Sequence, residues 1–432
     1  MHVARPDLIL LALLAALCLI GCGEESSQNP DGPADAAPDL AAPDLDSPDE
    51  GADMEQADQP DDMPPQDMGP AQITLPPEPW DIRAKGPYNV GFRTESLTYK
   101  AAPEDNDRTI KLVMWFPSTQ ATGSRRAKYL GAINRPGVWT DVPPAAGGAM
   151  PVLVFSHGNG SLGEQNYFMA EHFARHGWLV IAPYHTNNTI YDNEGSINFR
   201  VAPYRPQDIS ATIDWLLDRP AQDPLHKRAD ADKIALSGHS FGGFTTLATT
   251  GATFAVDPII AACEAGSIDS RYCTIFPTPE SVQLFRDGFV DPRIKVGIPQ
   301  TPAGASVFLE GLAQVRIPTL LLTGGRDQSL PNDEEGDPIW AGLPALGHNI
   351  RVDLPNAGHF TFSNMCDIVP NASLVRDDGC GPDFLPVETA YDIINTYSMA
   401  FMRRHLLGDR SHDDLLEGRT NHWGDAIIFS AK

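Results

Sequence analysis

KIALSGHSFGG, residues 233–243, joins a short apolar run to a glycine-rich segment and contains the pattern G-x-S-x-G. The pattern alone is short enough to arise by chance, so its meaning depends on what flanks it. KIALSG has the composition of a buried strand, and FGGFTTLATT (241–250) has that of a helix. A serine between such a strand and helix lies on a sharp turn at the carboxyl edge of a sheet. Ser240 is therefore the candidate nucleophile, and Gly238 and Gly242 leave room for the turn to pack.

The chain on both sides of this stretch predicts an α/β fold. Two strand-like segments, 86–100 and 108–118, come first, and short apolar runs then alternate with amphipathic segments. These runs are 151–156, 178–183, 233–238, 294–299, 318–325 and 349–355, with helix-like stretches at 164–177 and 206–219. Short apolar runs between glycines and prolines are typical of parallel strands buried on both faces. We expect a mostly parallel central sheet of about eight strands flanked by helices, with the long connections 184–206 and 254–292 shaping the mouth of a site.

A serine nucleophile needs a general base, and the base is expected after the last strand. DLPNAGHFTFS places His359 there, in a loop preceded by glycine. The other histidines near strands or helices fit this position less well: His172, His176 and His405 lie in helical stretches, and His185, His239 and His348 do not follow the last strand. His359 is the predicted base.

The base in turn needs an acid that orients it. Asp327 follows the strand 318–325 and lies between Ser240 and His359, which gives the chain order Ser, Asp, His. The strand before it ends in PQTPAGAS, which has no carboxylate. The downstream residues Asp333, Glu334, Glu335 and Asp337 read as a solvated acidic loop, with weak calcium binding as the alternative.

An acyl-transfer site also needs donors for the oxyanion that forms during attack. VFSHGNG (154–160) ends a strand with glycines on both sides of Asn159, which would let the backbone N–H of Asn159 face the reacting carbonyl. The second donor would be the backbone N–H of Phe241, the residue after the nucleophile. His157 fits a role in stabilising this loop better than a role as a base.

The N-terminal region predicts export and a lipid anchor. Leu8–Ile20 is an uninterrupted apolar run, too short for a membrane-spanning helix and typical of a signal peptide, and Cys22 ends it in a lipobox-like pattern. Residues 23–72 contain fifteen acidic residues and no Lys or Arg, with proline throughout, which predicts a disordered tether. We expect a signal peptide at 1–21, a lipidated Cys22 with a tether to 75, and a catalytic domain over 76–432. The expected location is a bacterial cell envelope, with the outer membrane or surface favoured and the periplasmic side the alternative.

Charge and cysteine content narrow the choice of partners and cofactors. The net charge is −26 and the chain has no basic run, which argues against a nucleic-acid partner. Cys263, Cys273, Cys366 and Cys380 are an even set in an exported chain, and the local pairing, 263 with 273 and 366 with 380, is preferred among three pairings. Neither C-x-x-C nor a histidine spacing suggests a metal site, so no metal or other cofactor is expected.

The folded part resembles the α/β-hydrolases related to plasma-type platelet-activating-factor acetylhydrolase and to bacterial dienelactone-hydrolase-like and polyester-hydrolase esterases. The resemblance covers most of residues 86–410 and rests on GPYNVGFRT, VFSHGNG, SGHSFGG, NAGHFTFSNMC and AFMRRHLLGD. It implies a metal-independent serine ester hydrolase with Ser240 as nucleophile, His359 as base, and Asn159 with Phe241 as oxyanion hole. One departure is the absence of an acid after the strand that follows the elbow, which favours Asp327 and a general esterase over phospholipid specificity.

The leading function is thus ester hydrolysis through an acyl-enzyme, on a small-molecule, lipid or polymer substrate. A serine peptidase on the same fold is the first alternative, and a non-catalytic binding protein displayed at the surface is the second. The sequence has no evident propeller or cap of the kind that peptidases carry, and it keeps all three triad residues. The acyl group and the oligomeric state are not predicted.

Overall fold

The computed structural model describes residues 71–76, 78–193, 199–268 and 270–432, and the structural statements below concern these residues. The proposed signal peptide, Cys22 and nearly all of the acidic tether lie outside them. Among the described residues, no helix is long and apolar enough to cross a membrane.

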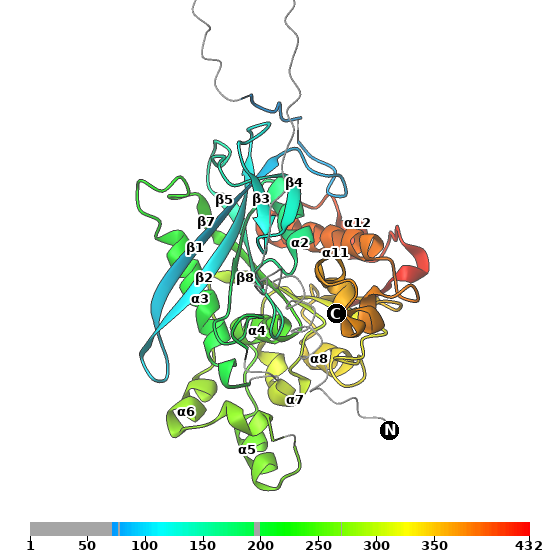
Figure 1. The fold of residues 1–432 in the computed structure, drawn as a ribbon. Coiled ribbons are helices and arrows are strands. Elements are labelled where there is room, and N and C mark those ends of the chain that lie inside the picture. Colours follow the sequence, from blue (N-terminus) through cyan, green and yellow to red (C-terminus); the bar gives the residue numbers. More distant parts are fainter. Residues whose placement is uncertain (1–70, 77, 194–198, 269) are drawn as a thin grey trace, which may run out of the picture.

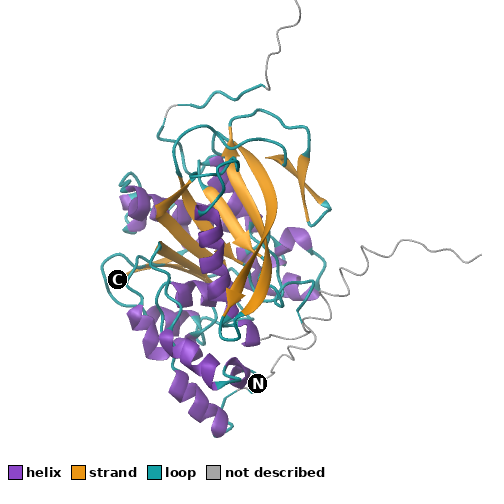
Figure 2. Cartoon of the chain, turned by 90° about the vertical axis from the view of Figure 1, so that its left-hand side faces the viewer, coloured by secondary structure: helices purple, strands orange, loops and turns teal. Residues whose placement is uncertain are grey.

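One twisted sheet of eleven strands runs through the centre of the molecule (Figures 1 and 2). The strands are β1 (Asn89–Ala101), β2 (Asn106–Ser118), β3 (Arg126–Tyr129), β4 (Ile133–Trp139), β5 (Met150–Ser156), β6 (Leu179–Pro183), β7 (Ala229–His239), β8 (Ile294–Gln300), β9 (Leu320–Gly324), β10 (Ile350–Leu354) and β11 (Ile428–Ala431). Their order across the sheet is β11-β10-β9-β8-β7-β5-β6-β2-β1-β4-β3. In the sheet, the block from β6 to β10 is parallel. β2 pairs antiparallel with β1 and with β6, β3 pairs antiparallel with β4, and β11 pairs antiparallel with β10, whereas β1 pairs parallel with β4.

The predicted α/β fold is confirmed, but the sheet is larger than the expected eight strands. The three additional strands, β3, β4 and β11, lie at the two ends of the sheet. β4 contains Pro136 and Gly137, which are residues that normally interrupt strands, and β3 and β11 are four residues long. Short or interrupted strands carry too little hydrophobic periodicity to be recognised from sequence.

Helices cover both faces of the sheet. They are α2 (Tyr167–Arg175), α3 (Tyr204–Leu217), α4 (Phe241–Thr249), α5 (Val256–Glu264), α6 (Pro279–Asp287), α7 (Ala305–Phe308), α8 (Gly336–Gly342), α9 (Met365–Ile368), α10 (Ser373–Val375), α11 (Val387–Met402) and α12 (Asp413–Leu416). On β5, Leu153 and Phe155 join the core packed by α2 and α11, while Val152 and Val154 join the core packed by α3. This alternation shows that the central strands are buried on both faces, as their apolar composition predicts.

The two long connections fold into separate features. Residues 254–292 form α5, α6 and a short turn, η2 (Tyr272–Ile275), and the two helices project away from the sheet at the bottom of Figure 1.

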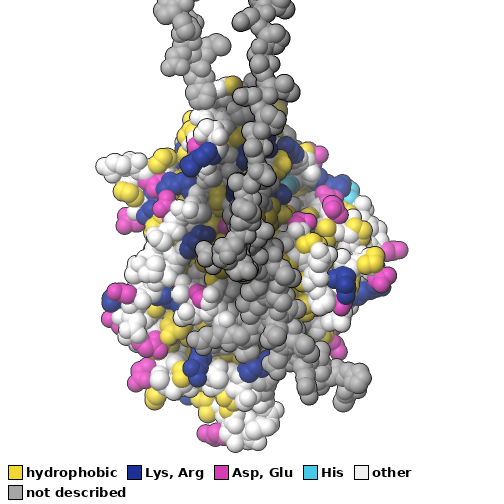
Figure 3. Space-filling view, in the orientation of Figure 1, with side chains coloured by type: hydrophobic (Ala, Val, Ile, Leu, Met, Phe, Trp, Pro, Cys, Tyr) yellow, Lys and Arg dark blue, Asp and Glu magenta, His cyan; other side chains and the backbone are white. Residues whose placement is uncertain are grey.

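On the face drawn in Figure 3, acidic and basic side chains are interspersed over the described surface. Side chains of opposite charge form surface ion pairs such as Arg286–Asp257 and Arg293–Asp214. They are exposed and contribute little to stability individually.

Candidate active site

Ser240 lies between the end of β7 and the start of α4, on a backbone turn with φ 59° and ψ −119°. A positive φ is uncommon for a residue other than glycine and costs of order 1–3 kcal/mol. Two backbone hydrogen bonds hold the turn: the Ser240 N–H donates to the Gln300 carbonyl at 2.9 Å, and the Gly243 N–H donates to the Ser240 carbonyl at 2.8 Å. The Ser240 side chain keeps some exposure. This is the geometry expected of a nucleophile elbow.

The glycines around Ser240 are required by close backbone packing. A Cβ on Gly238 would lie 2.2 Å from the Gly242 carbonyl oxygen, and a Cβ on Gly242 would lie 1.9 Å from the Ser156 carbonyl oxygen. Both distances are far inside van der Waals contact. The elbow can therefore pack against β5 and its own helix only if both positions lack a side chain.

His359 and Asp327 meet beside this turn. His359 begins a short turn after β10 (η4, His359–Phe362), and Asp327 lies in the loop after β9. The His359 Nδ1 is 2.8 Å from Asp327 Oδ2, and the two residues are 4% and 6% exposed. Because a carboxylate only accepts, Nδ1 carries the proton and Nε2 is left as the acceptor, the tautomer a general base needs.

The structure brings His359 next to the elbow but does not join it to Ser240. The imidazole of His239, the residue before Ser240, packs against the His359 ring at 4.6 Å between ring centres. Between the described Ser240 and His359 side chains there is no hydrogen bond. Such contacts often tighten only when substrate is bound.

Asp378 is a second buried carboxylate beside His359, and it was not predicted from the sequence. Its Oδ1 accepts the backbone N–H of His359 at 3.0 Å and that of Gln328 at 3.0 Å, and its Oδ2 accepts from the N–H and the hydroxyl of Ser329. Asp378 thus links the loop that follows Asp327 to the turn that begins at His359. Burial lowers the pKa of His359, but the charge and hydrogen bond of Asp327 and the charge of Asp378 outweigh it, so the pKa of His359 is raised.

The two predicted oxyanion donors lie on either side of Ser240. A Cβ on Gly158 would lie 3.3 Å from the Ser240 Cβ, which places the His157–Asn159 loop directly against the elbow. Among the described residues, none accepts a hydrogen bond from the Asn159 backbone N–H. Phe241 is the first residue of α4, where backbone N–H groups have no partner within the helix. Both N–H groups are therefore available to a ligand.

Gln165 connects the Asn159 loop to His359 through His239. Its side-chain oxygen accepts the Gly158 N–H at 2.7 Å, and its side-chain nitrogen donates to His239 Nδ1 at 3.0 Å. His239 Nε2 then donates to the His359 carbonyl at 2.9 Å. Burial, together with the neighbouring His359, keeps the pKa of His239 well below its usual value, so His239 is neutral and serves as a structural link.

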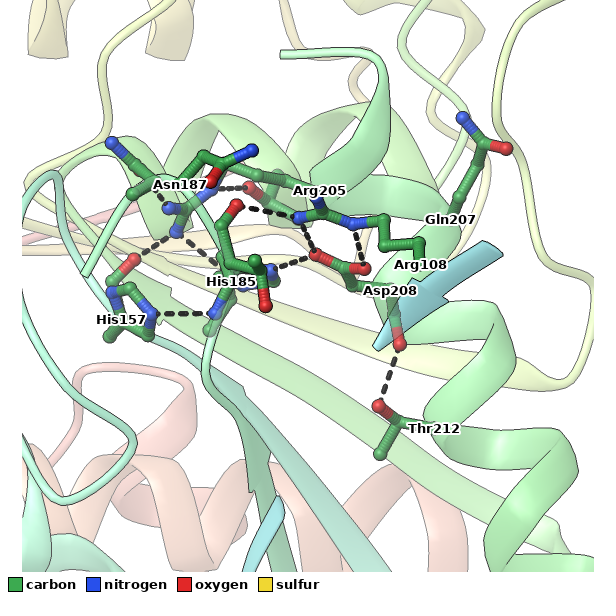
Figure 4. Close-up of polar contacts among 12 residues, drawn as sticks. Arg108, His157, His185, Asn187, Arg205, Gln207, Asp208 and Thr212 are labelled. Carbon is green, nitrogen blue, oxygen red and sulfur yellow. Dashed lines mark hydrogen bonds and ion pairs between the residues drawn. The ribbon is translucent and has the colours of Figure 1, made fainter. Parts of the chain in front are cut away.

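Ser156, His185 and Asp208 form a second Ser–His–Asp arrangement next to His157; Figure 4 labels its histidine and its aspartate. Asp208 Oδ2 is 2.8 Å from His185 Nδ1, and His185 Nε2 is 2.9 Å from Ser156 Oγ. All three residues are fully buried, so no substrate can reach Ser156. His157 accepts the His185 backbone N–H and lies 2.7 Å from the Gly158 carbonyl, which fits the loop-stabilising role predicted for it.

The long connections meet above α4. Phe199 stacks on Tyr272 with 4.7 Å between ring centres and packs edge-on against Phe241 at 6.0 Å.

The preferred cysteine pairing is present in the structure: Cys263 bonds Cys273 in η2, and Cys366 bonds Cys380, two residues after Asp378. Each disulfide therefore closes a short loop near a residue of the candidate site, Tyr272 for the first and Asp378 for the second.

The acidic loop after Asp327 is not uniformly solvated, contrary to expectation. Asp333 and Glu334 are exposed and Asp337 pairs with Arg351, but Glu335 is buried and accepts the N–H groups of Gly304 and Ala305 at 2.8 Å each. Burial raises the pKa of Glu335 to about 7. The described residues contain no group of three or more His, Cys, Asp or Glu side chains placed to hold a metal ion.

Comparison with solved structures identifies the architecture. A ferulic acid esterase from Streptomyces cinnamoneus superposes with a TM-score of 0.54 at 22% identity, covering 79% of this chain and 96% of that one. The chain therefore has the α/β-hydrolase fold. This confirms the fold that the sequence predicts.

Sequence relatives align with this chain over part of its length. Cutinase est1 of Thermobifida alba is 24% identical over 45% of this chain, and the platelet-activating factor acetylhydrolase of Cavia porcellus is 23% identical over 39%. The chain spans about half the length of each, 48% and 51%. The chlorophyllase family profile matches residues 133–261, which run from β4 past the elbow into α5.

The residues missed from the sequence are those that support the site from behind. Asp378, Gln165, Asn188, Arg205 and Asp208 are buried polar side chains whose partners lie far away in the chain. One signal was present: the stretch RPQD (205–208) puts an arginine and an aspartate on the first turn of a helix whose other buried residues are mostly apolar. Charged residues on a buried face require partners, so this stretch indicated a buried network.

Proposed function

We propose that this α/β-hydrolase is a serine carboxylic-ester hydrolase that works through an acyl-enzyme. The observation that carries the proposal is the convergence at one turn of a strained serine, a His359–Asp327 pair and two backbone N–H groups that have no partner among the described residues. Nucleophile, base, orienting acid and oxyanion donors are the parts that acyl transfer needs, and they come here from four separate loops.

The reaction follows from the position of each group. Ser240 Oγ attacks the ester carbonyl while His359 Nε2 accepts its proton, and the carbonyl oxygen receives the N–H groups of Asn159 and Phe241 as it becomes negative. His359 then gives the proton to the departing alcohol. A water molecule, deprotonated by the same imidazole, releases the acid. Asp327 keeps the imidazole in the required tautomer and stabilises its charged form.

The substrate class follows from the relatives only in outline. Their names, cutinase, platelet-activating factor acetylhydrolase and ferulic acid esterase, all describe proteins that act on esters. We propose an ester of a small molecule, a lipid or a polyester for this chain. A series of p-nitrophenyl esters of increasing acyl length, with a phospholipid and an aromatic polyester beside it, would rank these substrates.

The proposal is tested by three substitutions in the full chain. Ser240→Ala and His359→Ala should abolish p-nitrophenyl ester hydrolysis, and Asp327→Asn should lower kcat by roughly 10²–10⁴-fold because it favours the wrong tautomer. Ser267→Ala and His226→Ala serve as matched controls, since neither residue contacts the site, and should keep full activity. Full activity in Ser240→Ala would refute the proposal.

A further inference from the structure

Arg205 is a fully buried arginine on the first turn of α3, and its guanidinium reaches His157, two residues before Asn159 (Figure 4). Its guanidinium donates to four groups: the Asn188 side-chain oxygen at 2.5 Å, Thr245 Oγ1 at 3.0 Å, Ser156 Oγ at 3.2 Å and, most closely, the His157 carbonyl. The mechanism proposed above does not use this residue. Its contacts therefore call for a separate explanation.

Among the described residues, no carboxylate binds the Arg205 guanidinium directly. The nearest acid, Asp208, is engaged by Arg108 through two hydrogen bonds of 2.8 Å and also by Tyr99 and His185. Burial lowers the pKa of Arg205 to about 9, partly offset by the charge of Asp208. A buried cation held only by neutral acceptors is costly, and such an arrangement persists where it serves a site.

The contacts of Arg205 converge on the two predicted oxyanion donors. It holds the His157 carbonyl, two residues before Asn159, and it orients Asn188, whose amide donates to Asn159 Oδ1 at 2.8 Å. Its guanidinium also lies over the Phe241 ring, 4.7 Å from the ring centre. One side chain therefore touches the segments that carry both N–H groups, although these segments come from different strands.

We propose that Arg205 is a positioning residue of the oxyanion hole, fixing the Asn159 and Phe241 N–H groups at the separation that a developing oxyanion requires. The planar fork of arginine suits this role because it offers several donors in a rigid array, which lysine does not. Ser156, His185 and Asp208 extend the same network behind Arg205 and fix its orientation. The inference rests on the proposed ester hydrolysis.

Loss of this positioning should weaken binding of the transition state but not binding of the substrate. Misplaced N–H groups weaken binding of the oxyanion, which exists only during reaction, while the neutral ester still binds. Removing one oxyanion-hole donor in a serine hydrolase costs about 10²–10³-fold in kcat. Loss of the Arg205 fork should therefore act on kcat and leave KM nearly unchanged.

The test compares Arg205→Met and Arg205→Lys with Arg175→Met as a matched control. Arg175 is also buried and also donates to backbone carbonyls, those of Tyr88, Pro136 and Gly137, but it lies at the far end of α2. We expect Arg205→Met to lower kcat on a p-nitrophenyl ester about 10²-fold, with KM within threefold. Arg205→Lys should recover about a tenth of wild-type kcat, and Arg175→Met should keep kcat while melting at a lower temperature.

Affinity for a boronic acid, which mimics the tetrahedral intermediate, gives a second readout. It should fall in Arg205→Met in parallel with kcat and remain unchanged in Arg175→Met, because a purely structural role would not separate the two variants. If Arg205→Met does not fold, Asn188→Ala takes its place and should lower kcat about tenfold. The inference is overturned if folded Arg205→Met has the kcat of the wild type. If only Asn188→Ala can be obtained in folded form, a wild-type kcat in that variant overturns it. If the wild-type protein itself shows no turnover, the proposed function fails, and the inference fails with it.

Discussion

His359 shows how single residues set the pH range of this site. Asp327 is hydrogen-bonded to its ring and the Asp378 carboxylate accepts its backbone N–H, so two negative charges surround one imidazole. Together they raise the pKa of His359 in spite of its burial. The base must be neutral to accept the Ser240 proton, so activity should fall as the pH drops through a value above 6.5, the ordinary histidine pKa.

Replacing Asp378 by Asn tests this electrostatic account. Removing one negative charge destabilises the imidazolium, so the acidic limb of the kcat/KM profile should move to lower pH. Asp377→Asn is the matched control, because Asp377 is the adjacent residue but is exposed and pairs with Arg376. Its profile should match the wild type. A limb that stays in place in Asp378→Asn would mean that the Asp378 charge does not act on His359.

The proposed triad residues could be selected from the sequence because each of them, Ser240, Asp327 and His359, follows a recognisable strand. The residues that support them could not be selected in this way. Asp378 lies 19 positions after His359, in a segment without periodic pattern, and Arg205 has partners between 17 and 49 positions away. A single sequence contains no signal that pairs buried polar groups across such separations, because the pairing depends on how the strands are ordered in the sheet.

At the scale of elements, the elbow depends on how closely α4 approaches β5. Gly242 lies in the first turn of α4, where alanine would normally stabilise the helix by about 1 kcal/mol relative to glycine. Here alanine should instead destabilise the protein, because its Cβ would lie 1.9 Å from the Ser156 carbonyl oxygen. The steric term is the larger one, because neither backbone segment can move without displacing a central strand.

Gly242→Ala should therefore destabilise the folded protein by at least about 2 kcal/mol, the range typical of overpacked cores. Thermal unfolding of the purified variant measures the change. Gly148→Ala is the control: a Cβ there meets nothing within 4 Å, and its melting temperature should stay near that of the wild type. An unchanged or higher melting temperature in Gly242→Ala would show that helix propensity, and not packing, governs this position.

Elements with strong hydrophobic patterns were predicted at nearly their observed positions. The runs 151–156, 178–183 and 294–299 correspond to β5, β6 and β8 within one or two residues. β4 and β11 were not predicted, since one is interrupted by Pro136 and Gly137 and the other is a short, largely exposed edge strand. Their pairing is imposed by the neighbouring strand, which is a tertiary effect.

At the scale of the whole molecule, the parallel block of the sheet explains why distant segments meet. The carboxyl ends of β5, β7, β9 and β10 lie along one edge, and the Asn159 loop, Ser240, Asp327 and His359 follow these four ends in turn. Behind that edge, buried hydrogen bonds through Arg205, Gln165 and Asp378 tie the loops to one another. The site is thus built from loops, but a continuous polar network holds them.

The central claim, that Ser240 is a nucleophile activated by His359, is tested most directly by reaction with a fluorophosphonate probe followed by peptide mass spectrometry. The wild-type protein should take up one equivalent of probe, located on Ser240, and His359→Ala should be labelled at least about 10²-fold more slowly because the base is missing. Ser240→Ala should take up none. Wild-type protein that stays unlabelled, or that carries the label on another residue, would contradict the account.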